Sequence, residues 1–147
     1  MAKKAITPDM IADQFFKYLM HNQCHVCWRL LSEPSRKQFM AWTLNDIYQR
    51  HPKAAEAAKI GDAEVKLLFE NNDASIMKTF WKRFFYSSGA NEFFRYGYYE
   101  TIAHQGKRAT VRVKLVYPDG SQNEVDLQMV QELNGWKLAY VESGLPF

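Results

Sequence analysis

The sequence predicts an α+β domain in which helices come first and pack on one antiparallel sheet of four strands. Two observations predict this class. Apolar residues recur at helical spacing as far as residue 88, and from residue 93 they alternate with a period of two. Short glycine-containing loops, typical of hairpins, separate the alternating segments. The length of 147 residues suits a single domain over 1–147, with a helical part at 7–88 and a sheet at 93–142.

The composition is that of a globular protein. Hydrophobic residues make up 47% and charged residues 24% of the chain, which excludes a disordered tail, a collagen-like fibre and a disulfide-stapled miniprotein. The net charge of +3 is too small to indicate a nucleic-acid or membrane partner, and we expect neither. No apolar run reaches the length of a membrane helix, no secretion signal is recognisable and there are only two cysteines, so the sequence indicates the cytoplasm.

Capping residues and prolines mark the first three helices. Thr7-Pro8-Asp9 combines a capping hydroxyl, a proline in the first turn and an acid at the positive end of the helix. The polar stretch 21–23 breaks the apolar spacing, and a short helix follows from Cys24 to Leu31. Ser32-Glu33-Pro34 begins the third helix, which we expect to end before Pro52.

Three further helical segments are predicted before the sheet. The segment 52–61 holds an alanine-rich turn or two that begins at its proline and stops at its glycine. Asp62 caps a helix that ends at 71–72, and Asp73 caps the long aromatic helix that follows. The polar stretch 87–91 then closes the helical part.

Four strands are expected after this point. They are Phe93–His104, Lys107–Tyr117, Gln122–Leu133 and Trp136–Glu142. Two-residue turns at 105–106 and 134–135 join the outer pairs, because Asn-Gly and similar dipeptides favour tight hairpins. These turns pair Tyr98 with Val113, Glu100 with Val111, Leu133 with Trp136, Gln131 with Leu138 and Met129 with Tyr140.

The middle turn, Pro118-Asp119-Gly120, decides whether both hairpins share one apolar face. A two-residue loop would set apolar residues opposite charged ones. A three-residue loop with a left-handed Gly120 pairs Val113 with Val125 and Val111 with Leu127. We adopt this register because it gives one consistent apolar face. That face holds Phe94, Tyr96, Tyr98, Glu100, Ile102, Ala109, Val111, Val113, Leu115, Tyr117, Val125, Leu127, Met129, Gln131, Leu133, Trp136, Leu138 and Tyr140.

The opposite face of the sheet mixes apolar and charged residues. It presents Glu132 opposite Lys137, and a mixture of this kind suits a protein interface. We therefore expect a homodimer through this face, and a docking surface for another protein is an alternative. The apolar members are Tyr99, Val116, Val130, Ala139 and Val141, and the basic cluster is Arg95, Arg108, Arg112 and Lys114.

Several segments resemble one known superfamily when taken in order. They are Phe15-Phe16-Lys-Tyr-Leu, Cys27-Trp28-Arg-Leu-Leu-Ser-Glu-Pro-Ser-Arg36, the Pro-Asp-Gly hairpin and Asn134-Gly135-Trp136-Lys137-Leu138. Together they are similar to the nuclear transport factor 2-like (cystatin-like) superfamily, and in particular to its small bacterial domains of unknown function. The resemblance covers nearly the whole chain. It implies a curved, cone-shaped sheet wrapped around a helix, a pocket between them and frequent dimerisation through the sheet. The segment 52–72 looks like a helical insertion and is a candidate cover for the pocket mouth.

The fold alone does not determine the function, because this superfamily includes isomerases, ligand binders and interaction modules. We expect a non-catalytic domain, without a cofactor, that binds a small apolar or aromatic ligand or another protein. The alternative is a cofactor-independent lyase or isomerase of the ketosteroid-isomerase type, with Glu100 as base and Tyr18, Tyr96 or Tyr98 as hydrogen-bond donor. The expected pocket residues are Phe15, Tyr18, Phe84, Tyr96, Tyr98, Glu100, Val113, Met129, Gln131, Trp136 and Tyr140.

Glu100 is the polar residue on which this pocket depends. It lies in mid-strand on the predicted apolar face, across from Val111. A buried carboxylate must meet a donor or stay protonated with a raised pKa, and either would make it the polar anchor of an aromatic pocket. The alternative is that the strand twists or bulges near Gly97 and turns Glu100 to solvent.

Two other groups of residues are interpreted as structural. Cys24 and Cys27, with His21 nearby, form only one pair of metal ligands, whereas zinc sites usually combine two such pairs. We therefore expect buried thiols and no metal. The aromatic-rich segment 80–99 lacks the second motif of an RNA-binding sheet and is expected to form core and pocket lining.

On the third helix, Arg50 lies on the polar side with Arg36 and Lys37. The sequence contains no phosphate loop, nucleophile elbow or HExxH motif.

Overall fold

The structure, a computed structural model, describes residues 5–71 and 75–146. These residues form seven helices followed by four strands, so the predicted α+β class is confirmed. The helices are α1 (Pro8–Met20), α2 (Cys24–Leu30), α3 (Glu33–Arg50), α4 (Pro52–Ala58), α5 (Asp62–Asn71), α6 (Ser75–Ser87) and α7 (Ala90–Tyr96). The strands are β1 (Gly97–Gln105), β2 (Arg108–Val116), β3 (Gln122–Glu132) and β4 (Gly135–Leu138).

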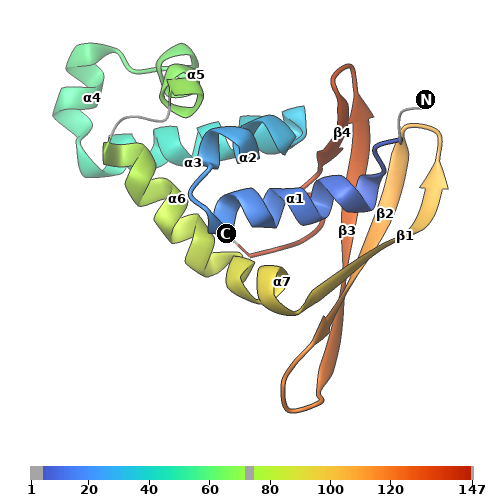
Figure 1. The fold of residues 1–147 in the computed structure, drawn as a ribbon. Coiled ribbons are helices and arrows are strands. Elements are labelled where there is room, and N and C mark those ends of the chain that lie inside the picture. Colours follow the sequence, from blue (N-terminus) through green and yellow to red (C-terminus); the bar gives the residue numbers. More distant parts are fainter. Residues whose placement is uncertain (1–4, 72–74, 147) are drawn as a thin grey trace.

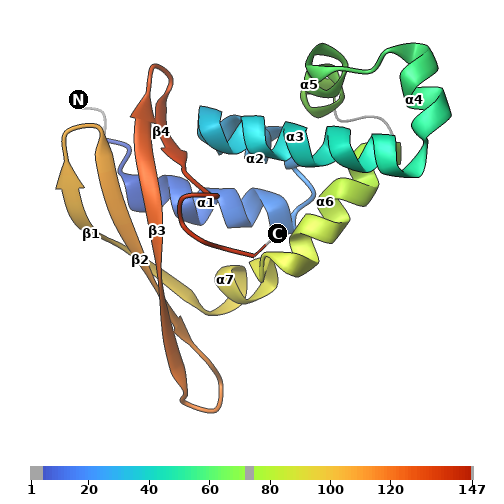
Figure 2. The same ribbon diagram turned by 180° about the vertical axis from the view of Figure 1, so that it is seen from behind.

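The strands form one antiparallel sheet in the order β1-β2-β3-β4, and the sheet is not closed into a barrel (Figure 1). α1 lies across one face of the sheet, called the inner face below, and contacts β1, β2 and β4. α4 contacts α3, and α5 contacts α2 and α3. Both views place α4 and α5 at the end of the molecule away from the sheet (Figures 1 and 2). The predicted insertion therefore does not lie against the sheet.

The core lies between α1 and the inner face. Phe15 and Phe16 of α1 are fully buried, and the Phe16 ring stacks on that of Phe93 with 4.4 Å between their centroids. Each fully buried apolar side chain contributes roughly 1.5–3 kcal/mol, so this layer is a main source of stability. The inner face supplies Val111, Val113, Leu127, Met129 and Leu138, none more than 1% exposed.

An aromatic cluster extends this core into the other helices. The Phe39 ring of α3 packs against Trp81 and Phe84 of α6 and against Tyr140, which follows β4. Phe69 of α5 meets Trp81 edge to face. This cluster holds α3 and α6 in a fixed relation, on which the site described below depends.

Most predicted helix boundaries are confirmed. α1 begins at Pro8, α4 begins at Pro52, and the Ser32 hydroxyl accepts a 3.4 Å hydrogen bond from the Ser35 N–H at the start of α3. α4, however, ends at Ala58, where Lys59 takes a left-handed conformation, and not at Gly61. The predicted cap at Asp73 lies outside the described residues.

The prediction that 87–91 closes the helical part is wrong. The chain makes another helix, α7, and β1 begins at Gly97 instead of Phe93. A Cβ atom at position 97 would lie 2.5 Å from the carbonyl oxygen of Phe93, so only glycine permits this tight change from helix to strand. Phe94 and Tyr96, expected on the apolar face of the sheet, therefore belong to a helix.

The predicted register of β1 is also wrong. The turn to β2 is formed by Gly106 and Lys107, and a bulge lies between Thr101 and Ala103. Tyr98 pairs with Lys114 and Glu100 with Arg112, where the prediction had Val113 and Val111. The one-residue bulge turns the first half of β1 over, so that Tyr99 and Thr101 face inward while Tyr98 and Glu100 face outward.

The middle turn is as predicted. Val113 pairs with Val125 and Val111 with Leu127, and Gly120 has a left-handed φ of 87°. This register keeps the apolar residues of β2 and β3 on the inner face.

The last hairpin is shifted by two residues from the prediction. Met129 pairs with Leu138 and Gln131 with Trp136, around a two-residue loop formed by Leu133 and Asn134 instead of 134–135. A shift of two preserves the faces of the strands. The predicted pairing of Glu132 with Lys137 is wrong, because Lys137 lies opposite Val130.

Within residues 5–71 and 75–146, no helix combines the length and the apolar composition that crossing a membrane requires.

Candidate functional site

The predicted pocket between helices and sheet is occupied by packed side chains. Tyr18, Tyr98, Glu100 and Gln131 are exposed, and the half-buried Tyr96 lies in α7 with its ring against Tyr117. None of the eleven predicted residues lines the helical cavities described below. Six of them are buried core residues: Phe15, Phe84, Val113, Met129, Trp136 and Tyr140.

Glu100 lies on the outer face of the sheet, so its predicted place in an apolar pocket is wrong. It is exposed and stands opposite Arg112. The Arg112 guanidinium makes two hydrogen bonds to the Asp126 carboxylate, with Nε–Oδ1 at 2.9 Å and Nη2–Oδ2 at 3.2 Å. These bonds lower the pKa of Asp126. Glu100 therefore belongs to a surface charge network, and the geometric ground for a Glu100 base is lost.

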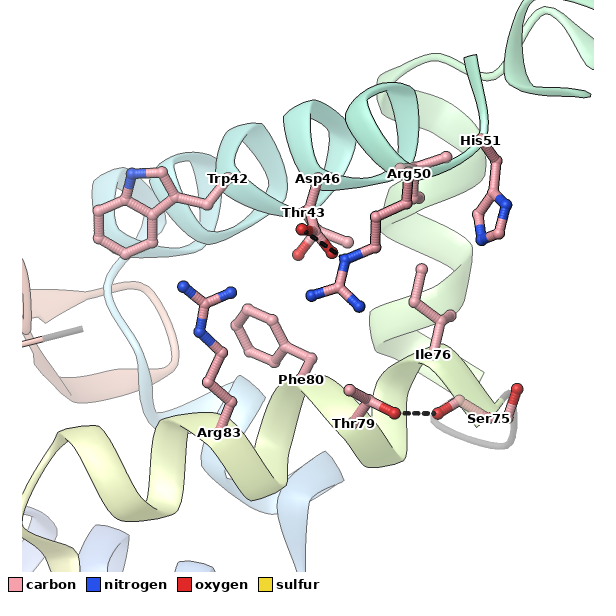
Figure 3. A pocket seen from close by; sticks show the side chains of 11 residues that line it. Trp42, Thr43, Asp46, Arg50, His51, Ser75, Ile76, Thr79, Phe80 and Arg83 are labelled. Carbon is pink, nitrogen blue, oxygen red and sulfur yellow. Dashed lines mark hydrogen bonds and ion pairs between the residues drawn. The ribbon is translucent and has the colours of Figure 1, made fainter. Parts of the chain in front are cut away.

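A different cavity, of about 240 Å³, lies between α3 and α6 (Figure 3). The Arg50 and Arg83 guanidinium groups enter it from opposite helices, with the Phe80 ring between them. His51 stands at one end and the Trp42 indole at the other. Its lining is Trp42, Thr43, Asp46, Ile47, Arg50, His51, Ser75, Ile76, Thr79, Phe80 and Arg83.

Helical spacing explains why these residues meet. Thr43, Ile47 and Arg50 follow one another at three- and four-residue steps, which places them on one face of α3. Ile76, Phe80 and Arg83 do the same on α6. Each helix thus contributes an apolar middle and an arginine, and the aromatic cluster beneath holds the two faces together.

The floor of the cavity is apolar. Ile47 is only 6% exposed, and the half-buried Phe80 packs its ring against Phe39 and, edge to face, against Phe69. The Trp42 ring lies 5.6 Å from that of Phe39. Packed aromatic walls of this kind provide flat surfaces for an apolar or aromatic group.

The two threonine hydroxyl groups of the lining are committed to the backbone. Thr43 Oγ1 donates a 2.9 Å hydrogen bond to the Phe39 carbonyl, and Thr79 Oγ1 donates one of 3.2 Å to the Ser75 carbonyl. A threonine hydroxyl has only one proton to donate. The guanidinium groups, with five N–H donors each, are the richest source of donors in the lining.

The charge of the cavity is positive. Arg50 Nε lies 3.0 Å from Asp46 Oδ1, one turn earlier on α3, which orients the guanidinium and neutralises part of its charge. Arg83 adds a second positive charge, while Asp46 is the only acid among the lining residues that the structure describes. An excess of positive charge over apolar walls favours an anion that carries an apolar body.

The two cysteines are buried, as predicted. The Cys27 thiol donates a 3.4 Å hydrogen bond to the Phe15 carbonyl, and burial raises the pKa of Cys24 to about 11 and that of Cys27 further. Both thiols are therefore protonated near neutral pH and unreactive. In the part of the chain that the structure describes, no three His, Cys, Asp or Glu residues gather as metal ligands would.

Of the predicted basic cluster, Arg95 belongs to α7 and not to the sheet, and two of the three residues on the outer face are paired. Arg112 binds Asp126, and Arg108 Nη1 lies 2.9 Å from Glu142 Oε2. Pairing of this kind weakens the case for a basic docking surface.

Arg50 can be identified from the sequence as a polar residue of the third helix, whereas Arg83 has no such signal. The apolar stripe of α6 that precedes Arg83 is predicted to form core and pocket lining, and this conceals the arginine at its end. The sequence pattern that indicates this site occurs on both α3 and α6: an apolar helical face with an arginine at its end.

No family model, curated protein or solved structure matches this chain. The resemblance to the nuclear transport factor 2-like superfamily therefore stays a prediction.

Proposed function

We propose that this protein is a small-ligand-binding domain whose ligand is an aromatic carboxylate, held between α3 and α6. The observation that carries the proposal is the approach of Arg50 and Arg83 from opposite helices over the ring of Phe80 (Figure 3). Guanidinium groups bind carboxylates through paired hydrogen bonds, and they also stack on aromatic faces.

The size of the cavity supports a small ligand. Its volume of about 240 Å³ is below the usual range for drug-sized molecules, roughly 300–1,000 Å³. A single ring with one carboxylate suits this space better than a steroid or a nucleotide. The proposal keeps the expected class, a binding domain for a small aromatic ligand, and moves its site from the sheet to the helices.

Isothermal titration calorimetry with benzoate and its neutral analogue benzyl alcohol tests the proposal. Benzoate should bind more tightly than benzyl alcohol, and Arg83→Gln and Arg50→Gln should each weaken benzoate binding by about three- to tenfold, because both side chains are partly solvated. Arg29→Gln removes an exposed arginine elsewhere and is the matched control. Equal binding of the two ligands, or unchanged benzoate binding in both cavity variants, would contradict the proposal.

The compartment that we propose for this activity is the cytoplasm. Two free, buried cysteines support it, because proteins of oxidising compartments more often pair their thiols.

A further inference from the structure

We propose a second binding site, independent of the first, for an alkyl carboxylate: a single alkyl chain with an anionic head. The site is a cavity of about 610 Å³ between the end of α1, the start of α2 and one face of α6. Arg50, Arg83 and the other residues that line the first cavity take no part in it.

The inner part of this cavity is apolar. Leu19 is 2% and Trp81 4% exposed, and Met20 and Phe85 are half-buried beside them. A volume of about 610 Å³ falls well inside the range of ligand pockets, roughly 300–1,000 Å³. The space is thus large enough for a flexible chain, and its lining supplies the contacts that such a chain needs.

The charged residues of the lining are all positive. Lys78 and Lys82 stand one turn apart on α6, and both are exposed. Among the residues that the structure describes, no aspartate or glutamate lines the cavity and neither lysine forms an ion pair. Two flexible ammonium groups above an apolar cavity complement an anionic head with an alkyl tail.

Trp81 supplies a spectroscopic reporter in the wall of this cavity. Its indole Nε1–H is buried and has no hydrogen-bond acceptor within the described residues. Buried donors are nearly always satisfied in folded proteins, by protein groups, by water or by a ligand. Because this nitrogen is itself buried in the cavity wall, its N–H signal serves as a reporter of binding in the cavity and not as a contact to the ligand.

The test is an NMR titration that follows the Trp81 indole N–H signal, assigned with Trp81→Phe. Decanoate, kept below its micelle concentration, should shift this signal saturably. The double variant Lys78→Gln/Lys82→Gln should weaken decanoate binding about three- to tenfold. The variant Lys53→Gln/Lys107→Gln, which removes two exposed lysines elsewhere, should bind decanoate as the unchanged protein does.

Two comparisons separate the alternatives. Decan-1-ol, which lacks the charge, should bind more weakly than decanoate, and equal binding would overturn the proposal. Vesicles of phosphatidylglycerol should cause no saturable shift. A response to vesicles without a response to free decanoate would assign the lysines to a membrane surface and overturn the proposal too. None of these results depends on benzoate binding between α3 and α6.

Discussion

The Thr101 hydroxyl donates a 2.6 Å hydrogen bond to Asp9 Oδ1, which joins the inner face of β1 to the first turn of α1. The two residues are far apart in sequence and both are half-buried. The contact exists only because the bulge between Thr101 and Ala103 turns Thr101 inward. It therefore links the N-terminal helix to the register of the first strand.

Removing this hydroxyl should destabilise the fold. We expect Thr101→Val to lower the free energy of unfolding by about 1 kcal/mol, because a partly buried hydrogen bond to a carboxylate is lost. Thr110→Val on β2 is the matched control, since Thr110 makes a longer bond of 3.3 Å to the neutral Gln128 and should cost less. Urea denaturation measures both, and equal effects would contradict the special role of the Asp9 contact.

The register of β1 predicts opposite outcomes for two neighbouring tyrosines. Tyr98 is 67% exposed on the outer face, whereas Tyr99 packs against Phe16 and donates a 2.9 Å hydrogen bond to the Phe93 carbonyl. Tyr98→Ala should change the free energy of unfolding by less than about 0.5 kcal/mol. Tyr99→Ala should lower it by about 2–3 kcal/mol, because a large ring is removed from the packed layer. Thermal or urea unfolding measures both variants. A larger loss of stability in Tyr98→Ala than in Tyr99→Ala would contradict this register and support the one predicted from the sequence.

Tyr99 should also make stability depend on alkaline pH. Its burial, and secondarily the charge of Asp13, raises the pKa of Tyr99 above the ordinary value of about 10. Between these two pKa values the unfolded chain ionises and the folded protein does not, so stability falls as the pH rises above about 10. Each such tyrosine should lower the free energy of unfolding by up to about 1.4 kcal/mol from pH 10 to 11.

Tyr99→Phe isolates this contribution from those of other tyrosines such as Tyr140, whose pKa burial also raises. At pH 8 the variant should be less stable than the unchanged protein by about 1 kcal/mol, through loss of the hydrogen bond. At pH 11 this difference should shrink, since phenylalanine does not titrate. A difference that stays constant from pH 8 to 11 in urea denaturation would argue against the raised pKa.

The homodimer expected through the outer face remains a prediction, with a changed set of residues. Tyr99 faces inward and Ala139 is fully buried, so neither can contribute. Val116 and Val130 keep their places on the outer face, and the exposed Tyr98 joins them. Light scattering at high micromolar concentration should show a dimer that Tyr98→Glu weakens. Leu67→Glu, which changes an exposed leucine on α5, should leave it intact, and a monomeric unchanged protein would refute the dimer.

The sequence predicts those parts of the fold that local chemistry specifies. Helix starts follow from Pro8 and Pro52, and the β2–β3 register follows from the left-handed Gly120. The bulge at Ile102 has no comparable signal, because neither a glycine nor a proline marks it. A single unpaired residue there was enough to carry Glu100 from the predicted pocket to the surface.

The candidate site depends on packing between helices, which is why the sequence identified only half of it. The second half of α7, from Phe93, has the aromatic residues that also favour sheets, and the sequence therefore predicts a strand there. Arg83 cannot be identified from the sequence of α6 alone. The apolar face of this helix does not show how far along its length another helix packs against it, and Arg83 lies where that packing ends. Only the relation of α3 to α6, set by Phe39 and its aromatic neighbours, brings Arg83 toward the same cavity as Arg50.

A map of benzoate binding by ¹H–¹⁵N NMR distinguishes a site between α3 and α6 from one on the sheet. If the ligand binds between α3 and α6, the side-chain Nε–H signals of Arg50 and Arg83 and the Trp42 indole signal should shift together and saturably. The amides of β2 and β3 should then stay in place, because the sheet lies apart from this cavity. Shifts centred on Val113, Met129 and their neighbours on the inner face, with the arginine signals unchanged, would contradict the site proposed here.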